Sequence, residues 1–139
     1  MAAYQDLRHG RHCVSALNVH LVFVTKYRRG VLDAQALEWL QAHFGKVCER
    51  MEARLLACDG EDDHVHLLVE YPPKLAIAAL VNALKGTSSR LLRKEMPHVA
   101  DRYRKGVLWT PSYFAASAGG APLAVLRQYV EQQRASSPP

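Results

Sequence analysis

Apolar and polar residues alternate along parts of the chain, which is the pattern of β-strands that bury one face. The alternation is clearest in segments 18–26 and 63–70. Segment 54–60 precedes the second of these, and the acidic turn between them predicts a hairpin. A strand is also expected over 108–116, interrupted early by Pro111 because proline has no amide hydrogen for a neighbouring strand. The pattern therefore predicts four strands.

Apolar residues recur at helical spacing in three other segments. Their expected bounds are 33–51, 76–96 and 122–134. Asp33 is a suitable N-cap for the first helix. The second helix is expected to end at Pro97, and a break is allowed near 85–87 because glycine lowers helix propensity.

These elements follow the order strand, helix, strand, strand, helix, strand, helix. The first six match the split βαβ, ferredoxin-like arrangement, in which helices cover one face of an antiparallel sheet. A chain of 139 residues is one domain by size. We therefore predict a single α+β, ferredoxin-like (RRM-like) domain over residues 1–139. Within it, residues 1–12 are expected to be a loose tail and 121–135 a mobile C-terminal helix.

Composition narrows the class of protein. Hydrophobic residues make up 49% of the chain and charged residues 22%, as in globular proteins. The longest apolar stretches are too short to span a bilayer, and the chain does not open with a signal-peptide pattern. Its 3 cysteines form neither a disulfide framework nor a zinc-finger pattern. We therefore expect a cytoplasmic protein with reduced thiols and no membrane partner.

Basic residues outnumber acidic residues by 18 to 13, and they cluster. One cluster follows the first strand, and the other lies on the second helix and beyond it. Such clusters favour a polyanionic partner, and the aromatic residues among them favour single-stranded nucleic acid. The alternative is a solvated basic surface without a partner. The candidate contacts to DNA phosphates are Lys26, Arg28, Arg29, Lys85, Arg90 and Arg93.

The most informative motif is His64-Val65-His66. Residues i and i+2 of a strand point to the same side, so the two imidazoles project from one face about 7 Å apart. That is close enough to share one metal ion. Ordinary polar surface residues are the alternative, and it is favoured until a third ligand and a reactive group are found. His20, on the less apolar face of the first strand, could lie near this site, but a structural histidine is the favoured interpretation.

The last predicted helix carries such groups. Tyr129 and Gln133 are four residues apart and therefore share one helix face. A phenol can act as a nucleophile in covalent catalysis, and an amide oxygen can be a hard metal ligand. The alternative for Tyr129 is a ring that packs on the domain.

Taken together, these segments resemble the single-tyrosine HUH transposases of small bacterial and archaeal insertion sequences, which are the TnpA-type, IS200-like family. The resemblance runs in order through most of the chain. Its blocks are the strand and loop 20–29, the histidine motif 63–69, the basic segment 84–90, Trp109 with 112–114 and the glycine pair 119–120, and the Tyr-x-x-x-Gln motif 129–133. The chain departs from the family at Asp62, where members often have proline, and in the few residues that follow Gln133.

The resemblance implies a function and a site. Tyr129 would be the nucleophile, and His64, His66 and Gln133 would hold a divalent metal, Mg²⁺ or Mn²⁺. The family cleaves and rejoins single-stranded DNA through a 5′-phosphotyrosine intermediate and recognises DNA hairpins at the ends of the element. It acts as a homodimer whose C-terminal helix can be exchanged between subunits, with Gly119 and Gly120 as the hinge.

Three other readings stay open. A domesticated nuclease of the same class would cleave repeat hairpins without moving an element. A non-catalytic module that binds single-stranded nucleic acid would have the same element order, although the aromatic pattern of RNA-recognition domains is missing. A zinc hydrolase would need an HxHxDH motif, and Leu67-Leu68 follows the two histidines instead.

Overall fold

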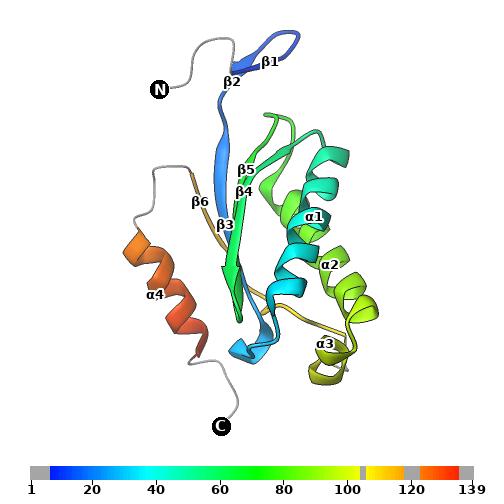
Figure 1. The fold of residues 1–139 in the computed structure, drawn as a ribbon. Coiled ribbons are helices and arrows are strands. Elements are labelled where there is room, and N and C mark those ends of the chain that lie inside the picture. The colour runs from blue at the N-terminus through cyan, green and yellow to red at the C-terminus, as the bar shows by residue number, and fades with distance from the viewer. Residues whose placement is uncertain (1–6, 104–105, 118–122, 135–139) are drawn as a thin grey trace.

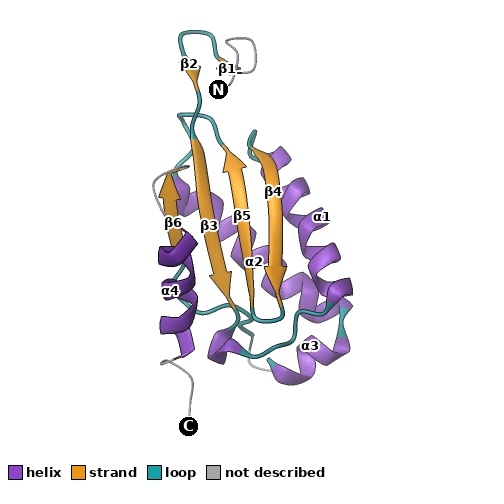
Figure 2. Ribbon diagram, turned by 60° about the vertical axis from the view of Figure 1, so that its left-hand side comes forward, coloured by secondary structure: helices purple, strands orange, loops and turns teal. Residues whose placement is uncertain are grey.

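The fold of the chain, seen in a computed structural model, is built on a four-stranded antiparallel sheet (Figures 1 and 2). The structure describes residues 7–103, 106–117 and 123–134. The strand order β4-β5-β3-β6 is that of a ferredoxin-like fold, so the predicted fold class is confirmed. The strands are β3 (Asn18–Val24), β4 (Arg54–Glu61), β5 (His64–Glu70) and β6 (Phe114–Ser117).

Helices cover the two faces of the sheet unequally. Figure 1 shows α1 and α2 side by side on one face and α4 alone on the other. The helices are α1 (Ala34–Arg50), α2 (Ile77–Glu95), α3 (Pro97–Arg102) and α4 (Leu123–Arg134). Asp33 caps α1 as predicted, because its side chain accepts a hydrogen bond from the amide of Ala36 at 2.8 Å. In the described part of the chain, no helix is long and apolar enough to cross a membrane.

The core lies between the sheet and the α1–α2 layer. Side chains that alternate along the two central strands point into it, as their period of two requires. The fully buried ones are Leu21 and Phe23 from β3 and Val65, Leu67 and Val69 from β5. The intervening side chains of both strands therefore point to the opposite face, which α4 covers.

The structure differs from the sequence expectations at three places. Within the expected tail 1–12, Arg8–His9 forms β1, which pairs with β2 (Val14–Ser15). The second helix runs through Gly86 without a break, and Pro97 opens α3 as its first residue. The fourth strand begins only at Phe114. The glycine hinge 119–120 and residues 1–6, 121–122 and 135 lie outside the described residues.

Candidate active site

The two histidines of β5 project from the sheet face opposite the core, as the strand pattern predicted. His64 pairs in register with Val24 of β3, and His66 pairs with Val22. Both histidines are half-buried, and Val65 between them is fully buried on the core side. The pair is therefore held on a rigid central strand, which suits a site that needs fixed geometry.

His64 is oriented by the carboxylate of Asp63, which begins the histidine motif and to which the sequence gave no role. Its Nδ1 lies 2.8 Å from Oδ1 of Asp63, which is only 8% exposed. Oδ2 of Asp63 accepts a hydrogen bond from Nε of Arg28 at 2.6 Å. Burial opposes ionisation of Asp63, but the hydrogen bonds from His64 and Arg28 outweigh it and lower the pKa of this carboxyl. An ionised Asp63 favours a proton on Nδ1 of His64, which leaves Nε2 as the lone-pair nitrogen.

His66 has a histidine as its neighbour. Its Nε2 lies 2.8 Å from Nδ1 of His20, and the two rings stack with centroids 5.0 Å apart. Burial, followed by the nearby His20, lowers the pKa of His66, so its imidazole is held neutral. A neutral imidazole is the form that binds a metal. The sequence favoured a structural role for His20 over a place near the site, whereas the structure puts His20 in contact with His66.

Three side chains at the β4–β5 turn have the spacing of a metal site. One ligand atom from each of Glu61, Asp63 and His64 lies within 4.8 Å of the others. Glu61 belongs to this group because it is the register partner of His64. Imidazole nitrogen with carboxylate oxygen is a donor set that accepts Mn²⁺ or Zn²⁺, and the carboxylates also suit Mg²⁺. The residues therefore fit a divalent metal, with Glu61 as a donor that the sequence motif did not indicate, while both carboxylate oxygens of Asp63 are engaged by His64 and Arg28.

Helix α4 docks on the same sheet face through its Tyr129–Val130 segment. Val130 is 8% exposed and packs against Val22 and Val24. The ring of Tyr129 lies 5.6 Å from that of Phe114, centroid to centroid. The nucleophile candidate is thus brought to the histidine-bearing face by its own chain.

The polar ends of Tyr129 and Gln133 meet at Ser112, a residue that the sequence placed in a family motif without a role. The Tyr129 hydroxyl lies 2.8 Å from Oγ of Ser112, and this Oγ also donates to Oε1 of Gln133 at 3.4 Å. Among the described residues, neither Tyr129 nor Gln133 hydrogen-bonds to His64 or His66. Phe114 of β6 and His66 of β5 both pair with Val22, one on each side of β3. The backbones at Phe114 and His66 are therefore two strand spacings apart, about 10 Å. The structure therefore joins the two α4 residues to each other but not to the histidines.

Two of the basic residues on α2 bind main-chain oxygens. Nζ of Lys85 donates to the carbonyls of Thr110, Pro111 and Ser112 at 2.6, 3.3 and 3.1 Å. Arg93 donates to Ser89 and Gly106, each at 3.0 Å.

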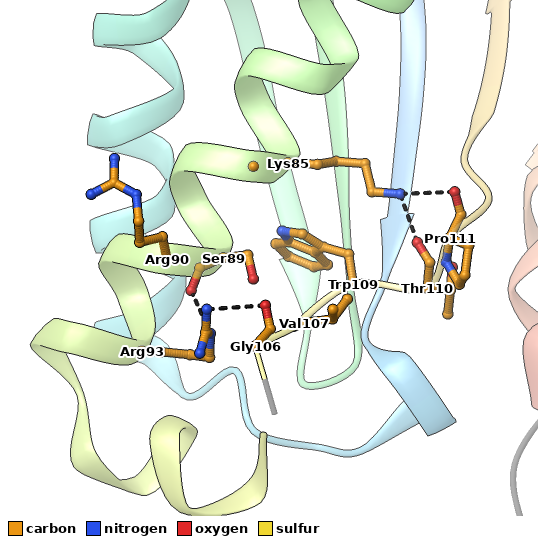
Figure 3. A pocket seen from close by; sticks show the side chains of 10 residues that line it. Lys85, Ser89, Arg90, Arg93, Gly106, Val107, Trp109, Thr110 and Pro111 are labelled. Atoms are coloured by element: carbon orange, nitrogen blue, oxygen red, sulfur yellow. Dashed lines mark hydrogen bonds between the residues drawn. The ribbon is translucent and has the colours of Figure 1, made fainter. Parts of the chain in front are cut away.

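These side chains line a cavity of about 390 Å³ between α2 and the segment that leads into β6 (Figure 3). Arg90 lies at its edge and is exposed.

The loop after β3, which includes the 3₁₀ helix η2 (Lys26–Arg28), holds the other basic cluster. Nζ of Lys26 lies 5.4 Å from the Tyr27 ring centroid, and the Arg29 guanidinium lies 5.1 Å from it. Arg29 also donates to the carbonyl of Arg102 and lies 5.4 Å from the Tyr103 ring. A cavity of about 320 Å³ is lined by these groups. Cations interleaved with aromatic rings are suited to nucleic-acid backbone and bases.

Comparisons with known proteins agree on one family. The family described as "Transposase IS200 like" matches residues 13–133. The ISDra2 transposase TnpA of Deinococcus radiodurans is 30% identical over 128 residues, which are 92% of this chain and 91% of that protein. The transposase for insertion sequence element IS200 of Salmonella typhimurium is 30% identical over 82% of this chain and 74% of that protein.

Solved structures give the same result for the fold. A crystal structure from Deinococcus radiodurans R1, described as that of a transposase, superposes with a TM-score of 0.82 at 32% identity. The match covers 91% of this chain and 98% of that one. A REP-associated tyrosine transposase bound to a REP hairpin superposes with a TM-score of 0.52 at 13% identity, over 89% and 68% of the two chains, which shows likeness of fold alone.

Proposed function

The chain belongs to the IS200-like transposase family, and on this premise we propose that it cleaves and rejoins single-stranded DNA at the ends of an insertion sequence. The reaction would pass through a 5′-phosphotyrosine intermediate on Tyr129. The observation that carries the proposal is the docking of α4, which brings Tyr129 to the sheet face that bears His64 and His66.

The proposed reaction is a transfer of a phosphodiester to tyrosine and back. The phenol oxygen of Tyr129 attacks the phosphorus atom, the bond from phosphorus to the 3′ oxygen breaks, and the 3′ oxygen leaves as a hydroxyl. The phenol gives up its proton during the attack, and the departing 3′ oxygen takes one up. Attack by a second 3′-hydroxyl reverses the step and joins the DNA again.

A divalent metal, Mg²⁺ or Mn²⁺, would neutralise and orient the scissile phosphate when bound. His64, His66 and Gln133 are the proposed ligands. Asp63 supports His64 in this role by holding its Nδ1. For Gln133 to join the histidines it must leave Ser112, and His66 must release Nε2 from His20.

The proposed partners are hairpins of single-stranded DNA and a second copy of this chain, with α4 exchanged between the two. The proposal of hairpin binding is supported by the REP-associated tyrosine transposase, whose solved structure contains a bound REP hairpin. We assign phosphate contacts first to Lys26 and Arg90, because Arg28, Arg29, Lys85 and Arg93 already donate to protein oxygens. Such a protein would act in the cytoplasm, where the element's DNA is found.

A denaturing gel tests the nucleophile. The protein is incubated with end-labelled single-stranded DNA carrying a hairpin and flanks from the element that encodes it, with Mg²⁺ or Mn²⁺. We expect a covalent protein–DNA adduct that disappears in Tyr129→Phe and persists in the matched control Tyr113→Phe. An adduct that survives in Tyr129→Phe would show that another residue is the nucleophile.

A further inference from the structure

The guanidinium of Arg28 contacts two carboxylates that come from opposite parts of the candidate site. Its Nε donates to Oδ2 of Asp63 at 2.6 Å. Its Nη1 and Nη2 donate to the two carboxylate oxygens of Glu131 on α4, both at 3.3 Å. A fork that meets both oxygens of one carboxylate fixes direction as well as distance. One side chain therefore links the residue that holds His64 to the helix that carries Tyr129.

The backbone around Arg28 is arranged to keep it there. Tyr27 and Arg28 have φ values of 62° and 53°, in the left-handed region that residues with side chains rarely adopt. Buried Thr25 holds both ends of this turn: its Oγ1 donates to the carbonyl of Arg29 at 2.8 Å, and its amide donates to that of Asp63 at 2.9 Å. Strained backbone persists only where neighbouring contacts enforce it, and such strain clusters at functional sites.

The two links of Arg28 differ in burial. The side chains of Arg28 and Asp63 are 18% and 11% exposed, whereas that of Glu131 is 60% exposed. A shielded ion pair is costly to break because it leaves a buried charge, while an exposed pair contributes little to global stability. The link to Asp63 is therefore a permanent part of the fold, and the link to Glu131 can open without unfolding the domain.

We propose that Arg28 is a positioning residue that docks α4 onto the histidine site, through Glu131, while it holds Asp63 against His64. The inference rests on the proposed function in one respect, namely that Tyr129 is the nucleophile. Arg28 acts through these two carboxylates and not through DNA. Since both carboxylates face its guanidinium, the local charge offered to a phosphate is no longer positive.

Hydrogen–deuterium exchange of the free protein tests the docking without DNA. Glu131→Gln is expected to speed exchange of the α4 amides by about two- to five-fold, as loss of an exposed ion pair allows. Arg28→Gln should do the same and also lower Tm, because Asp63 is left buried and unpaired. The α4 amides of the double variant should exchange no faster than those of either single variant, because both substitutions remove the same contact between Arg28 and Glu131. Gln132→Ala, an exposed neighbour on α4, is the matched control and should match the wild type.

Adduct formation separates positioning from a structural or DNA-binding role. Glu131→Gln should slow single-turnover adduct formation, by at most the factor by which it speeds α4 exchange because the docked fraction falls less steeply than the opening constant rises, with unchanged affinity for the hairpin and unchanged Tm. Arg28→Lys, which keeps the charge but loses the fork, should resemble Glu131→Gln in α4 exchange. Unchanged α4 exchange in both Arg28→Gln and Glu131→Gln would overturn the proposal. The absence of an adduct even in the wild type would count against the proposed function, while the exchange data would still decide the docking.

Discussion

Replacing Lys85 by methionine removes an ammonium group that ties α2 to the segment leading into β6. A hydrogen bond from a charged donor contributes about 1.5–3 kcal/mol to stability. The carbonyls of Pro111 and Ser112 are exposed and regain water in the variant, so the loss falls mainly on buried Thr110, whose carbonyl is 2.6 Å from Nζ. Half-burial of the ammonium, which lowers the pKa of Lys85, offsets part of this contribution. The free energy of unfolding should therefore fall by about 1–2 kcal/mol.

Calorimetry and DNA binding together test this role. For a domain of this size the loss corresponds to a fall in Tm of about 3–10 °C. The binding constant for single-stranded DNA, measured between about 50 and 200 mM salt, should keep its salt dependence, because a residue bound to carbonyls neutralises no phosphate. The matched control is Arg90→Gln on the same helix, which should keep Tm and lower the slope of log K against log salt by about 0.7. If Lys85→Met left Tm unchanged and made the slope of log K against log salt shallower, Lys85 would be a phosphate contact and would not hold α2 to the segment that leads into β6.

Three further outcomes follow from the structure. Hydrogen bonds from Arg8 and Arg54 lower the pKa of Glu70, so the free energy of unfolding of the wild type should fall as the pH drops below about 4.3. In urea unfolding, Glu70→Gln should lose less stability than the wild type over this pH range, and an identical pH profile of the two would contradict the assignment. Ser112→Ala frees the Tyr129 hydroxyl from its partner and should speed adduct formation about two- to five-fold in a single-turnover gel assay; slower formation would show that Ser112 assists the reaction. A mixture of Tyr129→Phe and His64→Ala should recover adduct formation if α4 is exchanged between copies, and no recovery at any ratio would leave the site within one chain.

The fold was predictable because its central strands bury one face only. In β3 and β5 the apolar residues stand at every second position, and that alone fixes which side chains face the core. The hairpin of β1 and β2 has two residues in each strand, too few for any periodicity. Its connection to the sheet is an ion pair between Arg8 and Glu70, 62 positions apart, which no local pattern reports.

The unbroken course of α2 has a similar explanation. A side chain at Gly86 would meet nothing within 4 Å, so this glycine occupies an open helix position. Its cost is then only the propensity difference from alanine, about 1 kcal/mol. Burial of Leu84 and Leu92 on either side outweighs that cost, since a buried leucine contributes about 1.5–3 kcal/mol. Packing against the sheet therefore overrides the local signal for a break.

The candidate site was predictable only in part, because its motifs are local and its contacts are not. His64 and His66 share a face by strand geometry alone, and Tyr129 and Gln133 share one by helix geometry. Side chains that complete the arrangement come from other elements and depend on pairing register or loop conformation. They are His20, Arg28, Glu61, Asp63 and Ser112. Cross-strand register, once a hairpin is assumed, could have placed Glu61 beside His64.

The left-handed turn at Tyr27 and Arg28 sets local backbone strain against the placement of one charged side chain. Each of these residues costs on the order of 1–3 kcal/mol in a conformation that glycine adopts freely. Glycine at position 28 would relieve the strain and remove the guanidinium in the same step, which leaves Asp63 buried without its partner and costs more than the strain releases. The strain at Arg28 is therefore offset by the ion pair that it makes possible, and thermostabilised versions of this domain are best sought elsewhere in the chain.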